Sequence, residues 1–196
     1  MKEYYDTRAP EYDDWYLGRG RFAARDRPGW GAELEQLFRV LEGLPGGRTL
    51  DVACGTGFLT RHVPGAVVGL DQSTRMLEEA ARQAPHATYV QGDALELPFP
   101  DDVFDRVLTG HFYGHLEAPE RTRFVTEARR VARELVVVDA SRSHSDVDEH
   151  MSQRELNDGS RWEVFKRYFT GEGLAAELGG GDVLLEGDWF VVVRAA

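Results

Sequence analysis

One short run, Leu50 to Phe58 (LDVACGTGF), constrains the fold of this chain more than any other. An apolar segment leads there into a turn of small residues, in which Gly55 and Gly57 can adopt backbone conformations that other residues avoid. A strand that ends in such a turn lets a ligand approach the backbone closely. The run therefore predicts a ligand site at the end of a strand, and the rest of the sequence indicates which ligand.

Short apolar segments alternate with amphipathic ones on both sides of this turn. We predict strands over 48–53, 66–71, 87–91, 104–109 and 135–140, and helices over 31–44, 73–84 and 119–132, with a further helix start over 57–63. Alternating strands and helices are typical of βαβ units, which build a parallel sheet covered on both faces. The predicted fold class is α/β, with a Rossmann-like, doubly wound, mostly parallel sheet.

The C-terminal segment breaks this alternation. A helix is predicted over 170–178, followed by strands over 183–185 and 189–193 that only three residues, Glu186 to Asp188, separate. So short a connection can only make an antiparallel hairpin. The sheet should therefore finish with a C-terminal antiparallel hairpin strand at or near its edge. The polar residues 141–161 predict a loop or a short helix beside the site.

The N-terminal segment is rich in aromatic residues set among charges. A disordered polar tail would not carry so many, so we expect this segment to fold over another part of the molecule. The whole chain, 1–196, is predicted to be a single domain. Within it, 1–44 would form an N-terminal aromatic arm and helix that act as a cap, and 45–196 the Rossmann-like core.

Charge and composition restrict the partners. The formal net charge of −11 makes the chain a poor electrostatic match for nucleic acid or an anionic membrane surface. There is one cysteine, Cys54, and no apolar run approaches the length of a membrane span. We expect a cytoplasmic protein, a monomer or homodimer, with no nucleic-acid and no membrane partner.

Acidic residues near the glycine turn narrow the choice of ligand. Asp71 ends the second predicted strand, where an acid can bind both ribose hydroxyls, and Asp93 follows the third, where it can accept from the adenine amine. No lysine follows the turn, which disfavours a nucleoside triphosphate, and Thr60 stands where a dinucleotide fingerprint has its third glycine. S-adenosylmethionine, which has no pyrophosphate, suits the pattern better than NAD, although NAD stays a weaker alternative.

Three segments, in this order, resemble the successive motifs of class I S-adenosylmethionine-dependent methyltransferases: LDVACGTGFLTRHV, VVGLDQSTRMLEEA and QGDALELPFPDDVFDRVLTGHFYGHL. The match covers roughly 48–140 and is to the small-molecule type akin to the ubiquinone and menaquinone biosynthesis enzymes. The opening YYDTRAPEYDDWY also resembles that group. The resemblance implies methyl transfer from S-adenosyl-L-methionine to a small-molecule acceptor. The alternatives are a protein that binds this cofactor without methylating, and, less favoured, an NAD-linked oxidoreductase.

The resemblance also implies a cofactor site, residue by residue. Asp51, Ala53, Gly55 and Gly57 would line the methionine end of the cofactor, and Tyr12 would cover it. Asp71 would bind the ribose, with Gln72 and Met76 beside the nucleoside, and Asp93 and Ala94 would contact the adenine. Thr109, Gly110 and His111 would lie near the sulfonium. The family often has glycine at the position of Ala53, and alanine is small enough to replace it.

Two histidines, His111 and His115, stand four residues apart. His111 is our candidate catalytic residue, since an imidazole titrates near neutrality and can act as a general base. For His115 we favour a packing role. Although this spacing can bind zinc on a helix, too few further ligands accompany it, and we predict no metal site.

Overall fold

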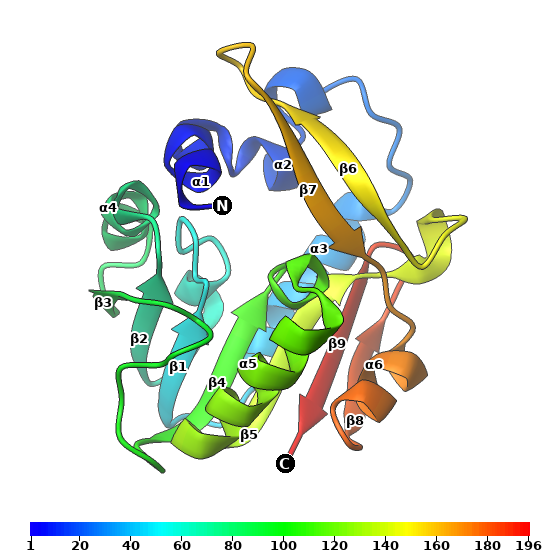
Figure 1. Ribbon diagram of the computed structural model, residues 1–196. Coiled ribbons are helices and arrows are strands. Elements are labelled where there is room, and N and C mark those ends of the chain that lie inside the picture. The colour runs from blue at the N-terminus through cyan, green and yellow to red at the C-terminus, as the bar shows by residue number, and fades with distance from the viewer.

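A seven-stranded sheet with helices on both faces, and a separate two-stranded hairpin, make up the computed structural model, which describes all residues, 1–196 (Figure 1). The helices are α1 Lys2–Arg8, α2 Asp14–Leu17, α3 Trp30–Glu42, α4 Thr74–Gln83, α5 Ala118–Val131 and α6 Gly171–Glu177, with short 3₁₀ turns at Ala9–Glu11, Gly20–Phe22, Thr60–His62, Tyr113–His115 and Arg142–His144. The strands are β1 Arg48–Val52, β2 Ala66–Asp71, β3 Thr88–Gln91, β4 Phe104–Gly110, β5 Ala132–Ala140, β6 Glu149–Glu155, β7 Arg161–Arg167, β8 Asp182–Glu186 and β9 Phe190–Ala195.

The strand order in the large sheet is β3-β2-β1-β4-β5-β9-β8. Strands β1 to β5 pair in parallel, whereas β9 runs antiparallel to both β5 and β8. This arrangement confirms the predicted fold class, including the reversed strand of the C-terminal hairpin near the sheet edge.

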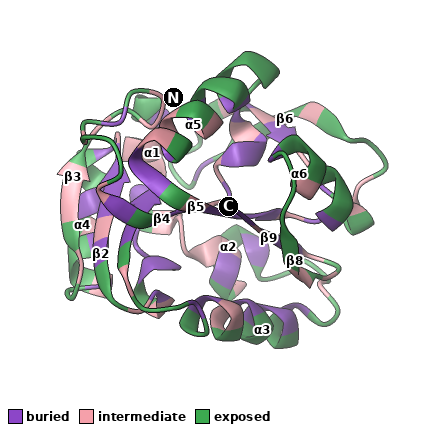
Figure 2. Ribbon diagram, turned by 90° about the horizontal axis from the view of Figure 1, so that it is seen from below, coloured by how far each residue is buried: buried purple, intermediate pink, exposed green.

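Two apolar layers hold helices on the two faces of the sheet. Along β4, Val107 packs in the layer with α5 and α6, and the next residue, Leu108, packs in the layer with α3. This alternation follows from the strand period of two, which sends successive side chains to opposite faces. Figure 2 shows the buried strands between α3 on one side and α5 and α6 on the other.

Local signals fix where the central helices begin and end. The Ser73 hydroxyl accepts a hydrogen bond from the Met76 amide, so the predicted N-cap of α4 is confirmed. Helix α5 begins with a capping box between Glu117 and Glu120 and runs directly into β5 at Ala132. Helix α5 therefore passes into β5 without an intervening loop.

Two predicted segments differ from the structure. The helix start over 57–63 is only the 3₁₀ turn Thr60–His62, because Pro64 and Gly65 follow before an α-helix can build. Residues 141–161, predicted as a loop or short helix, contain β6 and the start of β7. Most side chains of this hairpin are polar and partly exposed, so its apolar pattern is weak.

The N-terminal arm and the β6–β7 hairpin both lie beyond the carboxyl ends of the parallel strands (Figure 1). Tyr4 of α1 is fully buried in a small apolar cluster with Leu156 and Val164 of the hairpin region. Helix α3, which we grouped with the cap, packs instead on the sheet, because Leu37 and Leu41 join the same layer as β5 and β9. None of the helices combines the length and apolar character that crossing a bilayer requires.

Candidate functional site

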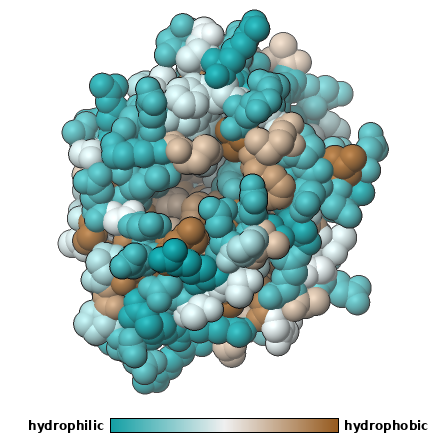
Figure 3. Space-filling view, in the orientation of Figure 1, coloured by the Kyte–Doolittle hydropathy of each residue, from teal (hydrophilic) through white to brown (hydrophobic).

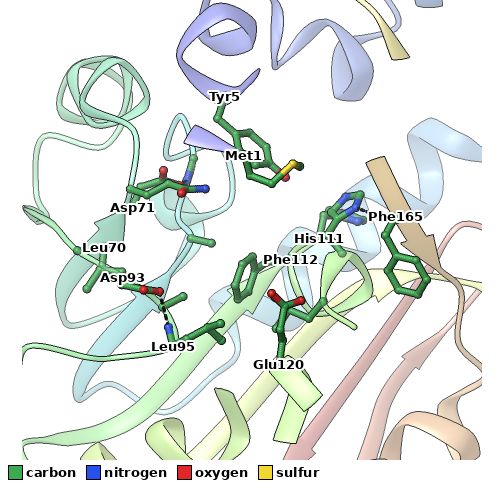
Figure 4. Close-up of a pocket in the computed structure, with 18 of the residues that line it drawn as sticks. Met1, Tyr5, Leu70, Asp71, Asp93, Leu95, His111, Phe112, Glu120 and Phe165 are labelled. Carbon is green, nitrogen blue, oxygen red and sulfur yellow. Dashed lines mark hydrogen bonds between the residues drawn. The ribbon is translucent and has the colours of Figure 1, made fainter. Parts of the chain in front are cut away.

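A cavity of about 650 Å³ opens at the carboxyl ends of the parallel strands. The strand order changes direction between β1 and β4, and such a switch point is where open α/β sheets bind their ligands. Figure 3 shows a hollow on this face of the molecule, with a few hydrophobic residues among hydrophilic ones. Figure 4 shows Asp71 and Asp93 on one side of the cavity and Glu120 and Phe165 on the other.

Asp71, at the end of β2, organises the first wall. Its Oδ2 accepts from the Gly55 amide at 3.0 Å and its Oδ1 from the Ser73 amide at 2.8 Å, so one carboxylate joins the β1 turn to the start of α4. The side chain is buried but borders the cavity. Burial raises the pKa of Asp71 from its usual value, and these amides oppose that shift. Each oxygen keeps lone-pair capacity for a ligand hydroxyl.

The turn after β1 is held in left-handed backbone. Gly55 has φ +54°, and Ala53, which is not glycine, has φ +57°. For an L-residue this conformation costs of the order of 1–2 kcal/mol, so glycine would be favoured at the Ala53 position. Both residues line the cavity, and the ring of Tyr12 lies over Gly55, about 3.6 Å from where a side chain would begin.

The β3 end forms the third part of this wall. Asp93 is exposed, and its Oδ1 accepts from the Leu95 amide at 2.8 Å, as drawn in Figure 4. Gln72 and Ala94 also line the cavity, and the side-chain Nε2 of Gln91 donates to the Gln72 backbone carbonyl at 3.0 Å. The ends of β2 and β3 therefore offer acids and amides to one ligand.

Asp51 lies behind this wall, on a small recess that shares Tyr12, Ala53 and Gly110 with the main cavity. It is 3% exposed and accepts from the Thr60 hydroxyl at 2.6 Å. Burial raises the pKa of Asp51 to about 7, and the Thr60 hydrogen bond opposes the shift.

Besides Asp51, three of the predicted site residues do not line the cavity. Met76 is fully buried in α4, and the Thr109 hydroxyl donates to the Val52 carbonyl at 2.8 Å. Gly57 faces α4, where a Cβ atom would lie 3.1 Å from the Ala80 Cα atom. These residues support the site by packing behind it. The predicted residues that do line the cavity are Tyr12, Ala53, Gly55, Asp71, Gln72, Asp93, Ala94, Gly110 and His111.

His111 follows β4 with φ +54° and is 8% exposed among aromatic rings, its ring centroid 4.9 Å from that of Trp15. Nδ1 lies 3.9 Å from Asp139 Oδ1, and the buried Nε2 has no hydrogen-bond partner. Burial lowers the pKa of His111 to about 4, although Asp139 opposes the shift. The imidazole is therefore neutral at pH 7.

His115 borders the cavity and also binds the hairpin, where we expected packing alone. Its Nδ1 lies 2.6 Å from the Phe165 carbonyl oxygen of β7. Burial lowers the pKa of His115 to about 3.

Beside this histidine the cavity is lined by residues that the sequence did not suggest: Glu117, Glu120, Met151 and Glu163. The turn Asp158-Gly159 and the alternating Trp162, Val164 and Lys166 of β7 are the signals that could have indicated a hairpin there. In the whole chain, no group of three or more His, Cys, Asp or Glu side chains is placed to hold a metal ion.

Comparisons with known proteins agree with this geometry. Residues 50–137 match the family model described as a methyltransferase domain. The 2-phytyl-1,4-naphtoquinone methyltransferase of Synechococcus elongatus is 36% identical over 135 residues, which cover 61% of this chain and 56% of that protein. The demethylmenaquinone methyltransferase of Lysinibacillus sphaericus is 38% identical over 98 residues, covering 45% and 41%. The chain thus spans about half the length of these relatives.

A solved structure extends the similarity to nearly the whole chain. DhpI in its complex with SAH has a TM-score of 0.72 and 26% identity, covering 98% of this chain and 92% of that one. The segment that matches the family model runs from β1 into β5 and carries Asp71, Asp93 and the glycine turn. The comparisons therefore confirm the resemblance that the sequence predicted: the chain is similar to class I S-adenosylmethionine-dependent methyltransferases, and its residues 50–137 match a methyltransferase domain.

Proposed function

We propose that this protein transfers a methyl group from S-adenosyl-L-methionine to a small-molecule acceptor. The observation that carries the proposal is the single cavity that joins the glycine turn of β1 to the acids at the ends of β2 and β3. Its volume of about 650 Å³ is within the range of sites that hold one or two small ligands. Relatives and structural neighbours that are named methyltransferases support the proposal.

The strand ends suggest how the cofactor would lie. Asp71 would accept from the ribose hydroxyls and Asp93 from the adenine amine, with Gln72 and Ala94 beside the base. The methionine end would reach the turn at Ala53 and Gly55, with the Asp51 carboxylate near its ammonium group and Tyr12 above. Thr109, Gly57 and Met76 would not contact the cofactor but would pack behind the residues that do, and so hold them in position.

Methyl transfer from a sulfonium needs little chemistry from the protein. The acceptor atom forms a bond to the methyl carbon as the carbon–sulfur bond breaks, so alignment and exclusion of water supply most of the rate. His111 has a neutral imidazole at the end of β4. We retain it as the candidate catalytic residue, but its low pKa makes it a weak base and favours orientation of the acceptor over removal of a proton.

The acidic surface favours a free small molecule over nucleic acid as the acceptor, because the net charge is −11. We expect the protein to act in the cytoplasm as a monomer or homodimer. The aromatic arm would cover the bound cofactor, since Tyr5 and Tyr12 both line the cavity.

Calorimetry with S-adenosylmethionine, its demethylated product and NAD tests the proposal. We expect micromolar or tighter binding of the first two, and no heat with NAD. Absence of S-adenosylmethionine binding would refute the function, and NAD binding would favour the oxidoreductase alternative. Cofactor binding without methylated product from any acceptor in a broad panel would favour the alternative of a binding protein.

A further inference from the structure

The cavity has a second half, away from the acids of β2 and β3. It is formed by Phe112 and His115 after β4, by Glu117 and Glu120 at the start of α5, and by Glu163 and Phe165 of β7. In Figure 4, Glu120 lies below His111, and both residues lie across the cavity from Asp71. Because the cofactor would occupy the β2 and β3 side, this half is where the acceptor would lie.

The charged side chains of this half are all acidic. Three carboxylates, Glu117, Glu120 and Glu163, line it, and no lysine or arginine lines any part of the cavity. The buried cation next to Phe165 in β7, Lys166, has its Nζ atom 2.6 Å from Asp139 Oδ1 and is neutralised by it. An anionic acceptor, such as a carboxylate or phosphate, would therefore meet three side chains of like charge and no cationic side chain, whereas a cation would be attracted.

The two histidines add no positive charge. A carbonyl oxygen only accepts, so His115 Nδ1 must carry the proton in its hydrogen bond to the Phe165 carbonyl, and Nε2 keeps its lone pair. Burial keeps both His111 and His115 neutral at pH 7. The Nε2 atom of His111, whose side chain is more than nine-tenths buried at the same strand end, has no hydrogen-bond partner in the protein.

The remaining walls are apolar or aromatic. Phe112 and Phe165 face this half from two elements, and Leu116 and Met151 complete it. Aromatic faces attract cations as well as apolar groups. Hydrogen-bond acceptors, carboxylates and rings together match a ligand that donates hydrogen bonds, carries positive charge and has an apolar body.

We propose, on the basis of the proposed methyl transfer, that the acceptor is a small primary or secondary amine with an aryl or other apolar body. The carboxylates of Glu120 and Glu163 attract its cationic form, and the His115 imidazole accepts a hydrogen bond from the neutral amine. The bound ammonium first loses a proton to water or a carboxylate. The neutral amine nitrogen then forms a bond to the methyl carbon as the carbon–sulfur bond breaks to leave a thioether. The new ammonium group then gives a proton to water or a carboxylate.

A matched panel of acceptors tests this inference: 2-phenylethylamine, its trimethylammonium analogue, 4-ethylphenol, a reduced naphthoquinone and 3-phenylpropionate. Binding is measured by calorimetry to the protein saturated with the demethylated cofactor product, and N- or O-methyl products by mass spectrometry after addition of S-adenosylmethionine. We expect both cations to bind, with N-methylation of the primary amine alone, and no binding of the carboxylate. Preferred binding or methylation of the phenol, the reduced quinone or the carboxylate would overturn the inference.

Two variants, Glu120→Gln and Glu163→Gln, localise the effect. Glutamine at 120 can still accept from the Glu117 amide, so the capping box of α5 is kept. Each change should weaken amine binding roughly tenfold, the size of one charge-assisted hydrogen bond. S-adenosylmethionine binding should stay within about twofold. Unchanged amine affinity in both variants would refute the inference, whereas loss of cofactor binding by the unmodified protein would refute the proposed function itself.

Discussion

The two halves of the cavity are built in different ways. The half formed by the ends of β1, β2 and β3 comes from the turns that follow three successive strands, and Asp71 joins two of these turns through backbone amides. The other half comes from the segment after β4, from α5 and from β7, and its Phe165 lies 53 positions after Phe112. The first half is set by local chain geometry, and the second by packing of distant segments. A substitution in one half should therefore impair the binding of its own ligand and leave the binding of the other ligand intact.

The largest expected effect is on the cofactor half. Asp71→Ala should weaken S-adenosylmethionine binding by at least about a hundredfold, because it removes a carboxylate acceptor for the ribose and leaves the Gly55 and Ser73 amides without a partner. Calorimetry measures the loss. Glu78→Ala, at an exposed acid of α4, is the control and should not change the affinity. Equal binding by the Asp71 variant would show that this strand end does not hold the cofactor.

The second prediction concerns the acceptor half. Lys166→Met would leave the Asp139 carboxylate buried without its cation, at a cost of about 3 kcal/mol in the free energy of unfolding. Arg161→Met removes an exposed ion pair of the same hairpin and should cost under about 1 kcal/mol. Chemical denaturation measures both variants.

The Lys166 variant also tests whether the halves are independent. At a temperature where it is folded, acceptor binding should be lost and S-adenosylmethionine affinity should change only a few-fold. An equal loss of both would show that the hairpin, as well as the strand ends, determines cofactor binding.

The third prediction is a pH dependence centred on Asp51. Its pKa of about 7 in the folded protein lies above the ordinary value of 3.8, so the folded state binds this proton more tightly than the unfolded state. The contribution of Asp51 to stability is therefore full below about pH 4 and is lost as the pH rises through about 7. Ionisation would in turn favour the cofactor ammonium, so S-adenosylmethionine affinity should rise roughly tenfold between pH 6 and 8.

Asp51→Asn should flatten the pH profiles of stability and of S-adenosylmethionine affinity, which thermal unfolding and calorimetry can follow from pH 5 to 8. If Asp51→Asn leaves the pH profile of S-adenosylmethionine binding unchanged, Asp51 does not lie near the methionine end of the cofactor.

The histidines affect stability in the opposite direction. His111 and His115 stay neutral in the folded state, so their contributions to stability fall as the pH drops from about 6.5 toward their pKa values of about 4 and 3.

The smallest expected effect concerns the strained turn. Ala53→Gly should stabilise the fold by about 1 kcal/mol, because glycine adopts the φ of +57° without steric cost. Ala81→Gly, at an exposed right-handed position inside α4, should destabilise it by a similar amount. Thermal melts of the two variants should move in opposite directions. A fall in both would show that the turn is not strained.

Much of the cofactor half was predictable because its signals are local. The apolar run before Gly55, the acid that ends β2 and the Ser73 cap each follow from short-range backbone preferences, and their order indicated the fold. The family resemblance that these motifs carry then implied nine residues that line the cavity. Packing decided the rest of that half. Gly57, Met76 and Thr109 follow the same pattern, yet they face helix or strand neighbours, and no local signal distinguishes a residue that touches a ligand from one that supports it.

The sequence by itself determined the α/β alternation, the reversed strand β9 and the identity of the ligand turn, because periodicity and glycine placement act within a few residues. Only the tertiary structure decided what faces the cofactor across the cavity. The Asp139–Lys166 ion pair and the contact between His115 and Phe165 bring the hairpin over the strand ends. Such contacts join residues up to fifty positions apart, and their free energy depends on burial, which no short segment of sequence reports.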